Sequence, residues 1–279
     1  MRAFEKFFPE KSVAPSAIIH VTCTGYCAPS AAQQLVSENG WGSRTQVFHA
    51  YHMGCYASHP AVRLGAALVN SLDQASGPVE IVHTELCSLH MNPEGNDPAQ
   101  MVIQSLFADG YMAYSLRRSE TMNNHLSHGP AALEILRMRD AVIPDSADDM
   151  RWTTGPSVYT MKLDKEVPNK LAAALPRFLT SLLREAGLDP AAKETAVFAI
   201  HPGGPRIVEG FERALHLTSA QTRFSREILF ERGNMSSATL PFIWQRILES
   251  PEIPSDTLIV SLGAGPGLTL SGALFVKRG

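Results

Sequence analysis

Short apolar runs alternate along the chain with segments whose apolar residues recur at helical spacing. Apolar runs rich in β-branched residues predict strands, and a spacing of three to four residues predicts helices. In the first half we expect strands at 17–23, 45–51, 79–86 and 111–116, and helices at 29–38, 57–70 and 96–107. In the second half we expect strands at 157–163, 195–201, 257–262 and 268–276, and helices at 169–186, 206–215, 221–231 and 235–249. This alternation predicts an α/β protein built from two similar halves around central sheets.

The stretch between these halves is more polar and less periodic. Residues 117–151 show at most two short strand patterns, at 131–136 and 138–143. We therefore divide the chain into an N-terminal half (1–118), a connecting segment (119–150) and a C-terminal half (151–279).

Composition narrows the class of protein further. The 279 residues are 44% hydrophobic and 18% charged, with a formal net charge of −3, which gives no argument for nucleic acid or an anionic membrane as partner. Four cysteines are too few for a disulfide scaffold of this length. Residues 1–11 lack an apolar signal core, and no apolar run is long enough to span a bilayer. We expect a cytoplasmic protein.

Cys55 is the first candidate for chemistry. It follows Gly54 where the strand at 45–51 gives way to a helix that is apolar nearly all round. Such a helix belongs in a core, and its first amide groups favour a negative charge. A thiolate at that position would have a lowered pKa and would be a usable nucleophile. The alternative is an inert core cysteine, since free cysteines are often buried.

Three more residues have both a chemical and a structural interpretation. His201 ends an apolar strand and precedes the rigid turn Pro202-Gly203-Gly204-Pro205, so it is either an acid, base or oxyanion donor or a loop histidine. Asn234 precedes a helix, where asparagine is a common N-cap but can also donate to an oxyanion. Phe107, at the apolar end of a helix, is typical of core packing.

Other patterns are weaker. His49, His52 and Cys55 resemble a zinc set, but strand alternation would point the two histidines to opposite faces and no second ligand pair follows. Cys23 and Cys27, four residues apart, are likewise weak as a metal or redox pair. The run from Gly263 to Gly267 (GAGPG) lacks the spacing of a dinucleotide fingerprint. We predict no metal site.

Seven ordered motifs together resemble one family, the type III polyketide synthases of the chalcone and stilbene synthase group, within the thiolase superfamily. These motifs are 22–30 (TCTGYCAPS), 53–57 (MGCYA), 84–87 (TELC), 106–110 (LFADG), 201–205 (HPGGP), 233–238 (GNMSSA) and 263–269 (GAGPGLT). The resemblance implies a thiolase-like fold, two pseudo-duplicated halves with central mixed sheets in αβαβα layers. Because members usually carry about a hundred more residues before the first motif, it also implies an incomplete N-terminal half.

The resemblance also implies roles for individual residues. Cys55 looks like the acyl-carrying nucleophile, and His201 and Asn234 like the pair that polarises a thioester carbonyl. Phe107 looks like the aromatic gate of the substrate tunnel. Further substrate-binding positions implied are Cys23, Cys87, His90 and Gly265. A charged His201 would pair with the Cys55 thiolate and lower its pKa further.

The implied reaction is the decarboxylative Claisen condensation of a malonyl thioester onto an acyl group carried by Cys55. Substrates would be coenzyme A or acyl-carrier-protein thioesters, with no cofactor. We expect a homodimer, or a heterodimer with another thiolase-fold chain. Ala28 and His90 stand where family members carry a dimer-crossing methionine and a small cavity residue, so both bear on the substrate. Two alternatives remain: a subunit of a heteromeric ketosynthase, and a cysteine-dependent acyltransferase or thioesterase that does not decarboxylate.

Overall fold

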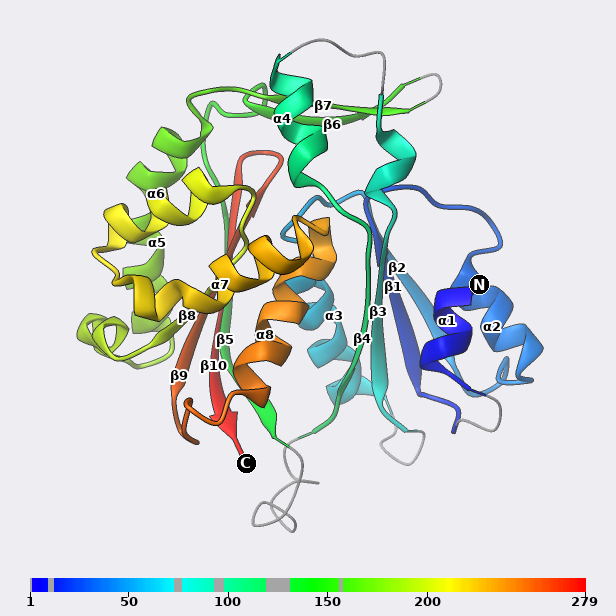
Figure 1. Cartoon of the computed structure of the whole chain (residues 1–279). Helices are drawn as coiled ribbons and strands as arrows, with labels where there is room; N and C mark the ends of the chain where they lie inside the picture. The colour runs from blue at the N-terminus through cyan, green and yellow to red at the C-terminus, as the bar shows by residue number, and fades with distance from the viewer. Residues whose placement is uncertain (1, 10–12, 73–76, 93–97, 119–130, 156–157) are drawn as a thin grey trace.

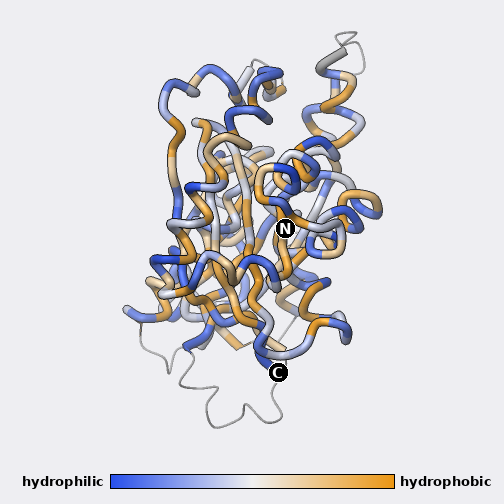
Figure 2. Tube along the Cα trace, turned by 90° about the vertical axis from the view of Figure 1, so that its left-hand side faces the viewer, coloured by the Kyte–Doolittle hydropathy of each residue, from blue (hydrophilic) through white to orange (hydrophobic). Residues whose placement is uncertain are grey.

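The computed structural model describes residues 2–9, 13–72, 77–92, 98–118, 131–155 and 158–279. Figure 1 shows two sheets seen nearly edge-on, with helices between them and on both outer sides. This arrangement confirms the predicted αβαβα layering. Along the tube in Figure 2, hydrophobic and hydrophilic stretches alternate at short intervals through the helices, as expected of elements with one buried side.

The first sheet has the strand order β2-β1-β3-β4. Its members are β1 (Ala17–Thr22), β2 (Gln46–Tyr51), β3 (Val79–Glu85) and β4 (Gly110–Leu116). The first three strands run parallel, and β4 is antiparallel to β3. The outer face is covered by α1 (Arg2–Phe7) and α2 (Ala31–Glu38), because Phe4, Leu35 and Trp41 pack there against Ile18.

The second sheet has the order β5-β10-β9-β8. Its members are β5 (Ala132–Val142), β8 (Val197–Ile200), β9 (Leu258–Gly265) and β10 (Thr269–Arg278). Only β8 and β9 are parallel to one another. The outer side carries α5 (Val167–Glu185) and α6 (Pro205–Leu215), and α7 (Ser219–Arg232) packs on β8.

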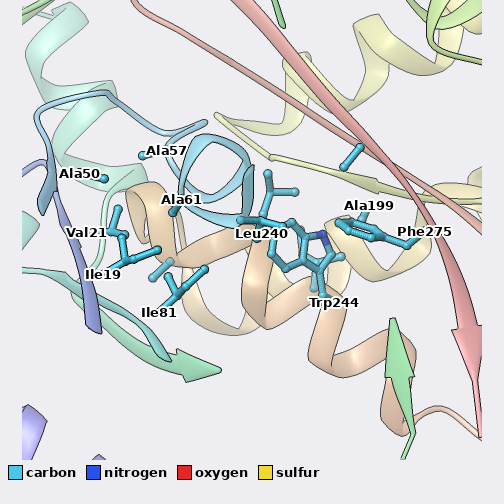
Figure 3. Packing of buried hydrophobic residues seen from close by; sticks show 14 of the residues in the cluster. Ile19, Val21, Ala50, Ala57, Ala61, Ile81, Ala199, Leu240, Trp244 and Phe275 are labelled. Atoms are coloured by element: carbon cyan, nitrogen blue, oxygen red, sulfur yellow. The ribbon is translucent and has the colours of Figure 1, made fainter. Parts of the chain in front are cut away.

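The central layer joins the two halves. It contains α3 (Ser58–Ser71) and α8 (Thr239–Glu249), which between them contact both sheets. Figure 3 shows the shared core: Ile19 and Ile81 from the first sheet approach α3 and α8, and Trp244 lies beside Phe275 of the second sheet. One hydrophobic cluster therefore spans both halves. Because α3 and α8 both pack within this cluster, their positions relative to each other are fixed.

A small cap lies over one end of this sandwich (Figure 1). It contains α4 (Pro98–Leu106) and the hairpin of β6 (Met150–Thr154) and β7 (Tyr159–Leu163). Short 3₁₀ turns lie at Cys87–His90, Pro190–Glu194 and Ser236–Ala238. In the part of the chain that the structure describes, no helix is long and apolar enough to cross a membrane.

The structure differs from the expected strands at two places. The two short strands expected at 131–136 and 138–143 form one strand, β5, which pairs along its length with β10 across a register shift. Strand β6 was not predicted. The three-part division of the chain stays a prediction, although β5 lies within its connecting segment and belongs to the second sheet.

Candidate active site

Cys55 lies in a tight turn between β2 and α3. Gly54 has φ +87°, a conformation that favours glycine, and a Cβ on it would lie 2.5 Å from Cδ of Pro266. The turn is closed by the Ala57 amide, which donates to the Gly54 carbonyl at 3.1 Å. Cys55 therefore precedes α3, which begins at Ser58, and the loop after β9 presses directly on its turn.

The Cys55 sulfur lies among hydroxyl and amide groups from the second half. The Ser236 hydroxyl donates to Sγ at 3.9 Å. The Asn234 side chain, like Ser236, acts to lower the pKa of the thiol. These groups come from the turn before α8, so folding brings Cys55 and Asn234 together across a gap of 179 residues (234 minus 55).

Asn234 is held by three hydrogen bonds. Its backbone N–H donates to the Leu106 carbonyl at 2.7 Å, and its own carbonyl accepts from the Ala108 amide at 2.9 Å. Its Oδ1 accepts from the Ser236 amide at 2.9 Å, which leaves the amide hydrogens for the sulfur. Asn234 is not itself an N-cap residue, since Met235 caps the 3₁₀ turn and Ala238 caps α8. Its role as an oxyanion donor stays a prediction, and its backbone bonds place Phe107 beside it.

His201 directly follows β8, and its backbone N–H donates to the Leu262 carbonyl of β9 at 2.8 Å. The side chain is 4% exposed, and neither ring nitrogen has a hydrogen-bond partner within the described residues. Burial lowers the pKa of His201 to about 4, so the ring is neutral at pH 7. A buried imidazole with both nitrogens unsatisfied is costly, and such groups are typical of functional sites.

The protonation state of Cys55 differs from the expectation. Burial is the largest effect and raises the pKa of the thiol to about 12, which outweighs the hydrogen bonds from Ser236 and Asn234. The carboxylate of Glu85 also raises it. The expected thiolate–imidazolium pair is therefore absent at neutral pH, because desolvation disfavours the charged form of both groups.

Cys55 borders a cavity of about 310 Å³ under the cap. Four of the predicted substrate-binding residues line this cavity with it: Phe107, Cys23, Cys87 and His90. Asn234 and His201 are not among the lining residues, although Ser236 is. Gly265 is not among them either. A Cβ on Gly265 would lie 2.4 Å from the Tyr56 ring, so this glycine makes room for the neighbour of Cys55, and Pro266 supplies the cavity contact.

The cap hairpin forms the far wall of the cavity. The His90 ring stacks on Tyr159 at 4.5 Å between centroids and meets Trp152 edge-on. His90 Nε2 bonds the Thr24 carbonyl at 2.7 Å, and its Nδ1 accepts from the Tyr159 amide at 3.0 Å. The Trp152 indole donates to the Cys23 carbonyl at 2.6 Å. Trp152 and Tyr159 were not predicted as site residues.

Glu85, at the end of β3, was also missed. Its carboxylate is fully buried, and it accepts from the Cys23 amide at 2.9 Å, the Thr24 hydroxyl at 3.1 Å, and both the amide and hydroxyl of Ser237. Burial raises the pKa of this carboxyl. The only signal in the sequence was a carboxylate at the end of a strand that is otherwise expected to be buried. Glu85 ties the end of β1 to the turn that carries Asn234.

Metal chemistry receives no support from the described part of the chain. Its histidine, cysteine and carboxylate side chains form no group of three or more that could hold an ion. His49 instead bonds the Ser30 hydroxyl at 2.9 Å, and His52 bonds the Trp152 carbonyl at 2.8 Å.

Known structures share this fold. The type III polyketide synthase domain of Steely1, a type I/III hybrid from Dictyostelium, superposes with a TM-score of 0.83 and 25% identity, over 98% of this chain and 74% of that one. The 1,3,6,8-tetrahydroxynaphthalene synthase of Streptomyces coelicolor gives 0.83 and 26%, over 95% and 72%. The fold is thus that of the thiolase-fold type III polyketide synthases.

Sequence comparison specifies the family. Residues 134–277 match the family of chalcone and stilbene synthases, C-terminal domain, and the chain belongs to this family. It is 28% identical over 257 residues to the S. coelicolor tetrahydroxynaphthalene synthase and covers 65% of that protein. It is 30% identical over 265 residues to "Probable polyketide synthase 1" of Dictyostelium discoideum, of which it covers 8%.

Proposed function

We propose that this chain acts as a condensing acyltransferase of the type III polyketide synthase kind, in which Cys55 carries the growing acyl group. The observation that carries the proposal is the Cys55 thiol at the wall of the cavity, where it accepts from the Ser236 hydroxyl. The side chain of Asn234, which is not part of the lining, acts to lower the pKa of the same thiol. The buried, unpartnered ring of His201 lies on the strand next to β9, whose following loop packs on the Cys55 turn.

The first step loads the starter. Neutral His201 accepts the thiol proton as the Cys55 sulfur attacks an acyl thioester, and the Asn234 amide stabilises the oxyanion that forms. The carbon–sulfur bond to the donor breaks, and the donor thiol leaves with the proton. Because both the thiol and the imidazole are neutral at rest, the thiolate and the imidazolium form only while a substrate occupies the cavity.

The second step forms the carbon–carbon bond. A malonyl thioester loses CO₂, and the resulting enolate oxygen is stabilised by donors from His201 and Asn234. The enolate carbon attacks the acyl carbon on Cys55, the carbon–sulfur bond to Cys55 breaks, and the thiolate that leaves takes up one proton from water. The largely apolar cavity limits protonation of the enolate by water. The reaction balances with two thioesters and calls for no cofactor.

Coenzyme A or acyl-carrier-protein thioesters serve as substrates in this proposal. The cap supports a preference among acyl groups, since His90, Trp152 and Tyr159 close one side of the cavity. The relatives' names include a tetrahydroxynaphthalene synthase and the α-pyrone polyketide synthase Pks18 of Mycobacterium tuberculosis, so we include malonyl and longer acyl groups among the starters to be tested.

Two further parts of the proposal concern the setting. We propose a homodimer that uses the β2 edge of the first sheet, because an edge strand offers unpaired backbone groups and β2 is only partly buried. We also propose a cytoplasmic location, which is supported by four free cysteines, Cys23, Cys27, Cys55 and Cys87, as expected in a reducing compartment. Light scattering of the purified protein tests the dimer, and a stable second thiolase-fold partner on purification would contradict it.

The test of function uses a panel of acyl and malonyl thioesters, carried on both coenzyme A and carrier protein. Intact-mass spectrometry should show acyl groups on the wild-type chain and none on Cys55→Ala. Release of CO₂ from malonyl thioester should require Cys55. Acyl transfer without CO₂ release would replace the proposal by a non-decarboxylating acyltransferase, and labelling that persists in Cys55→Ala would overturn the nucleophile.

A further inference from the structure

The proposed chemistry leaves one fully buried histidine unused. His59 lies in the first turn of α3, four residues after Cys55, and its side chain is 0% exposed. Its Nε2 lies 2.8 Å from the Ser261 hydroxyl of β9, and its Nδ1 lies 3.1 Å from the Ser271 hydroxyl of β10. Both ring nitrogens are therefore hydrogen-bonded to strands of the other half of the molecule, so His59 links the two halves as well as filling space in the core.

His59 belongs to a chain of hydrogen bonds, and the groups at the two ends of this chain determine where its protons lie. The Trp244 indole can only donate, and it does so to Ser261 Oγ at 2.9 Å. At the other end the Ser271 hydroxyl donates to Asp140, whose second oxygen accepts from Arg63. Ser271 has therefore used its hydrogen and must accept from His59 Nδ1–H. Nε2 then carries the lone pair and accepts the Ser261 hydroxyl.

This ordering requires a neutral His59. Burial lowers its pKa to about 3, and the charges of Arg63 and His201 act in the same direction, against an opposing effect of Asp140. The chain of bonds from Trp244 to Arg63 thus has one consistent arrangement at neutral pH, with His59 as the Nδ1–H tautomer.

The same chain links the elements that form the site. It runs from α8 through β9 to α3, then through β10 and β5 back to α3 at Arg63. Strand β9 also accepts the backbone N–H of His201, and its loop packs on Gly54 and Tyr56. Figure 3 shows Trp244 where α8 approaches Phe275 of β10. His59 is the point at which α3 is bonded to both β9 and β10.

We propose that His59 is a positioning residue, which through Ser261 and Ser271 holds the Cys55 turn of α3 in register with the strand that places His201. The role rests on the proposed function only in assuming that the alignment of Cys55 matters. It predicts that loss of the two bonds lets the turn move away from Asn234 and Ser236. Because those two groups lower the pKa of Cys55, the thiolate fraction and the reactivity of Cys55 should fall.

The test compares rates of Cys55 alkylation by iodoacetamide at pH 8, followed by peptide mass spectrometry with exposed Cys27 as internal reference. His59→Phe keeps a ring but neither bond, and should lower the Cys55 rate at least tenfold. His59→Gln retains one donor and one acceptor and should restore the rate to within about threefold of wild type. Ser271→Ala removes one of the two partners of His59 without changing α3, and it should lower the rate about threefold. This variant tests the proposal if His59→Phe does not fold.

A stability control separates positioning from simple weakening. Lys277 is 5% exposed and donates to the Ser250 and Ile247 carbonyls at the opposite end of β10. Lys277→Met should lower Tm but leave the alkylation rate unchanged. Equal rates in wild type and both His59→Phe and Ser271→Ala would overturn the proposal, as would failure of His59→Gln to rescue. Alkylation needs no condensation chemistry, so these results stand if the proposed function fails.

With an acyl thioester that loads Cys55, the same variants give a second readout. His59→Phe should reduce kcat about tenfold or more while KM stays within about twofold, because the cavity lining does not include His59. A change in KM alone would contradict a positioning role.

Discussion

At the scale of single residues, the site is built from groups that burial keeps neutral. Cys55 and His201 are each displaced from their ordinary pKa values, to about 12 and about 4, in the directions that remove charge. A resting site of this kind differs from a preformed ion pair, and under the proposed function the thiolate would form only when a substrate arrives to share the developing charge.

This neutrality predicts a pH profile for Cys55. Its alkylation by iodoacetamide should be slow at pH 7 and rise about tenfold per pH unit to at least pH 10, since the thiolate fraction grows in proportion to hydroxide below the thiol pKa. Peptide mass spectrometry of samples quenched over time measures the rate at each pH. A rate that levels off between pH 6 and 8 would instead reveal a thiolate–imidazolium pair.

Two substitutions separate the two functions of the Asn234 side chain, which are to accept from the Ser236 amide and to donate its amide hydrogens. Asn234→Asp keeps the acceptor for the Ser236 amide but loses the amide hydrogens, whereas Asn234→Ala loses both. Both variants should reduce kcat for condensation by roughly 10²–10³-fold, the usual effect of deleting an oxyanion donor. Steady-state kinetics and Tm are measured together. Wild-type turnover in Asn234→Asp would show that the hydrogen bond to Ser236, and not donation, is what matters.

At the scale of elements, the loop between β9 and β10 controls the turn that carries the nucleophile. A Cβ at Gly265 would come within 2.4 Å of a ring carbon of Tyr56, the residue next to Cys55, so the added methyl group must displace that ring and with it strain the turn. Gly265→Ala should therefore lower the Cys55 alkylation rate severalfold. Gly42→Ala is the matched control, since nothing lies within 4 Å of a Cβ there, and its rate should equal wild type. Equal rates in both variants would contradict this role of the loop.

Most elements could be predicted from hydrophobic periodicity, because each buries one side locally. The observed helix over Ser58–Ser71 and strand over Val79–Glu85 differ from the predicted bounds by one residue at most at either end. The continuity of β5 could not be predicted, since it depends on pairing with β10 more than a hundred residues away. β6 is half exposed and short, so its residues carry no strong alternation.

The site was predictable only as a set of separate residues. Motifs indicated Cys55, His201 and Asn234, but the sequence could not show which neighbours would surround them. Nothing in the local sequence of Glu85 or His59 indicates a partner, and their partners Ser237 and Ser271 come from the other half of the chain. The direction of the Cys55 pKa shift also depended on burial, which the turn sequence alone does not give.

At the scale of the whole molecule, buried histidines make folding sensitive to acid. Burial lowers the pKa of His20 and His201 to about 4 and of His59 and His83 to about 3. The unfolded chain binds these protons below about pH 6.5, whereas the folded chain does not until pH 3–4. Stability is therefore complete above about pH 6.5 and is lost as the pH falls.

Each histidine should contribute about 2 kcal/mol to that loss at pH 5. Glu80 and Glu85 oppose it, because their raised pKa values let the folded state take up protons first. We expect Tm to fall by roughly 10 °C between pH 7 and pH 5, measured by differential scanning calorimetry at constant ionic strength. A Tm that stays level over this range would mean that these histidines are not buried neutral.

The dependence of the Cys55 turn on residues 263–266 has a consequence for biosynthesis. A ribosome delivers the thiol some two hundred residues before the strand and loop that complete its surroundings. Until that late segment arrives, Pro266 does not pack on Gly54, so the turn that carries the cysteine lacks its final support. The reactivity of the thiol should then change when synthesis has passed the loop between β9 and β10.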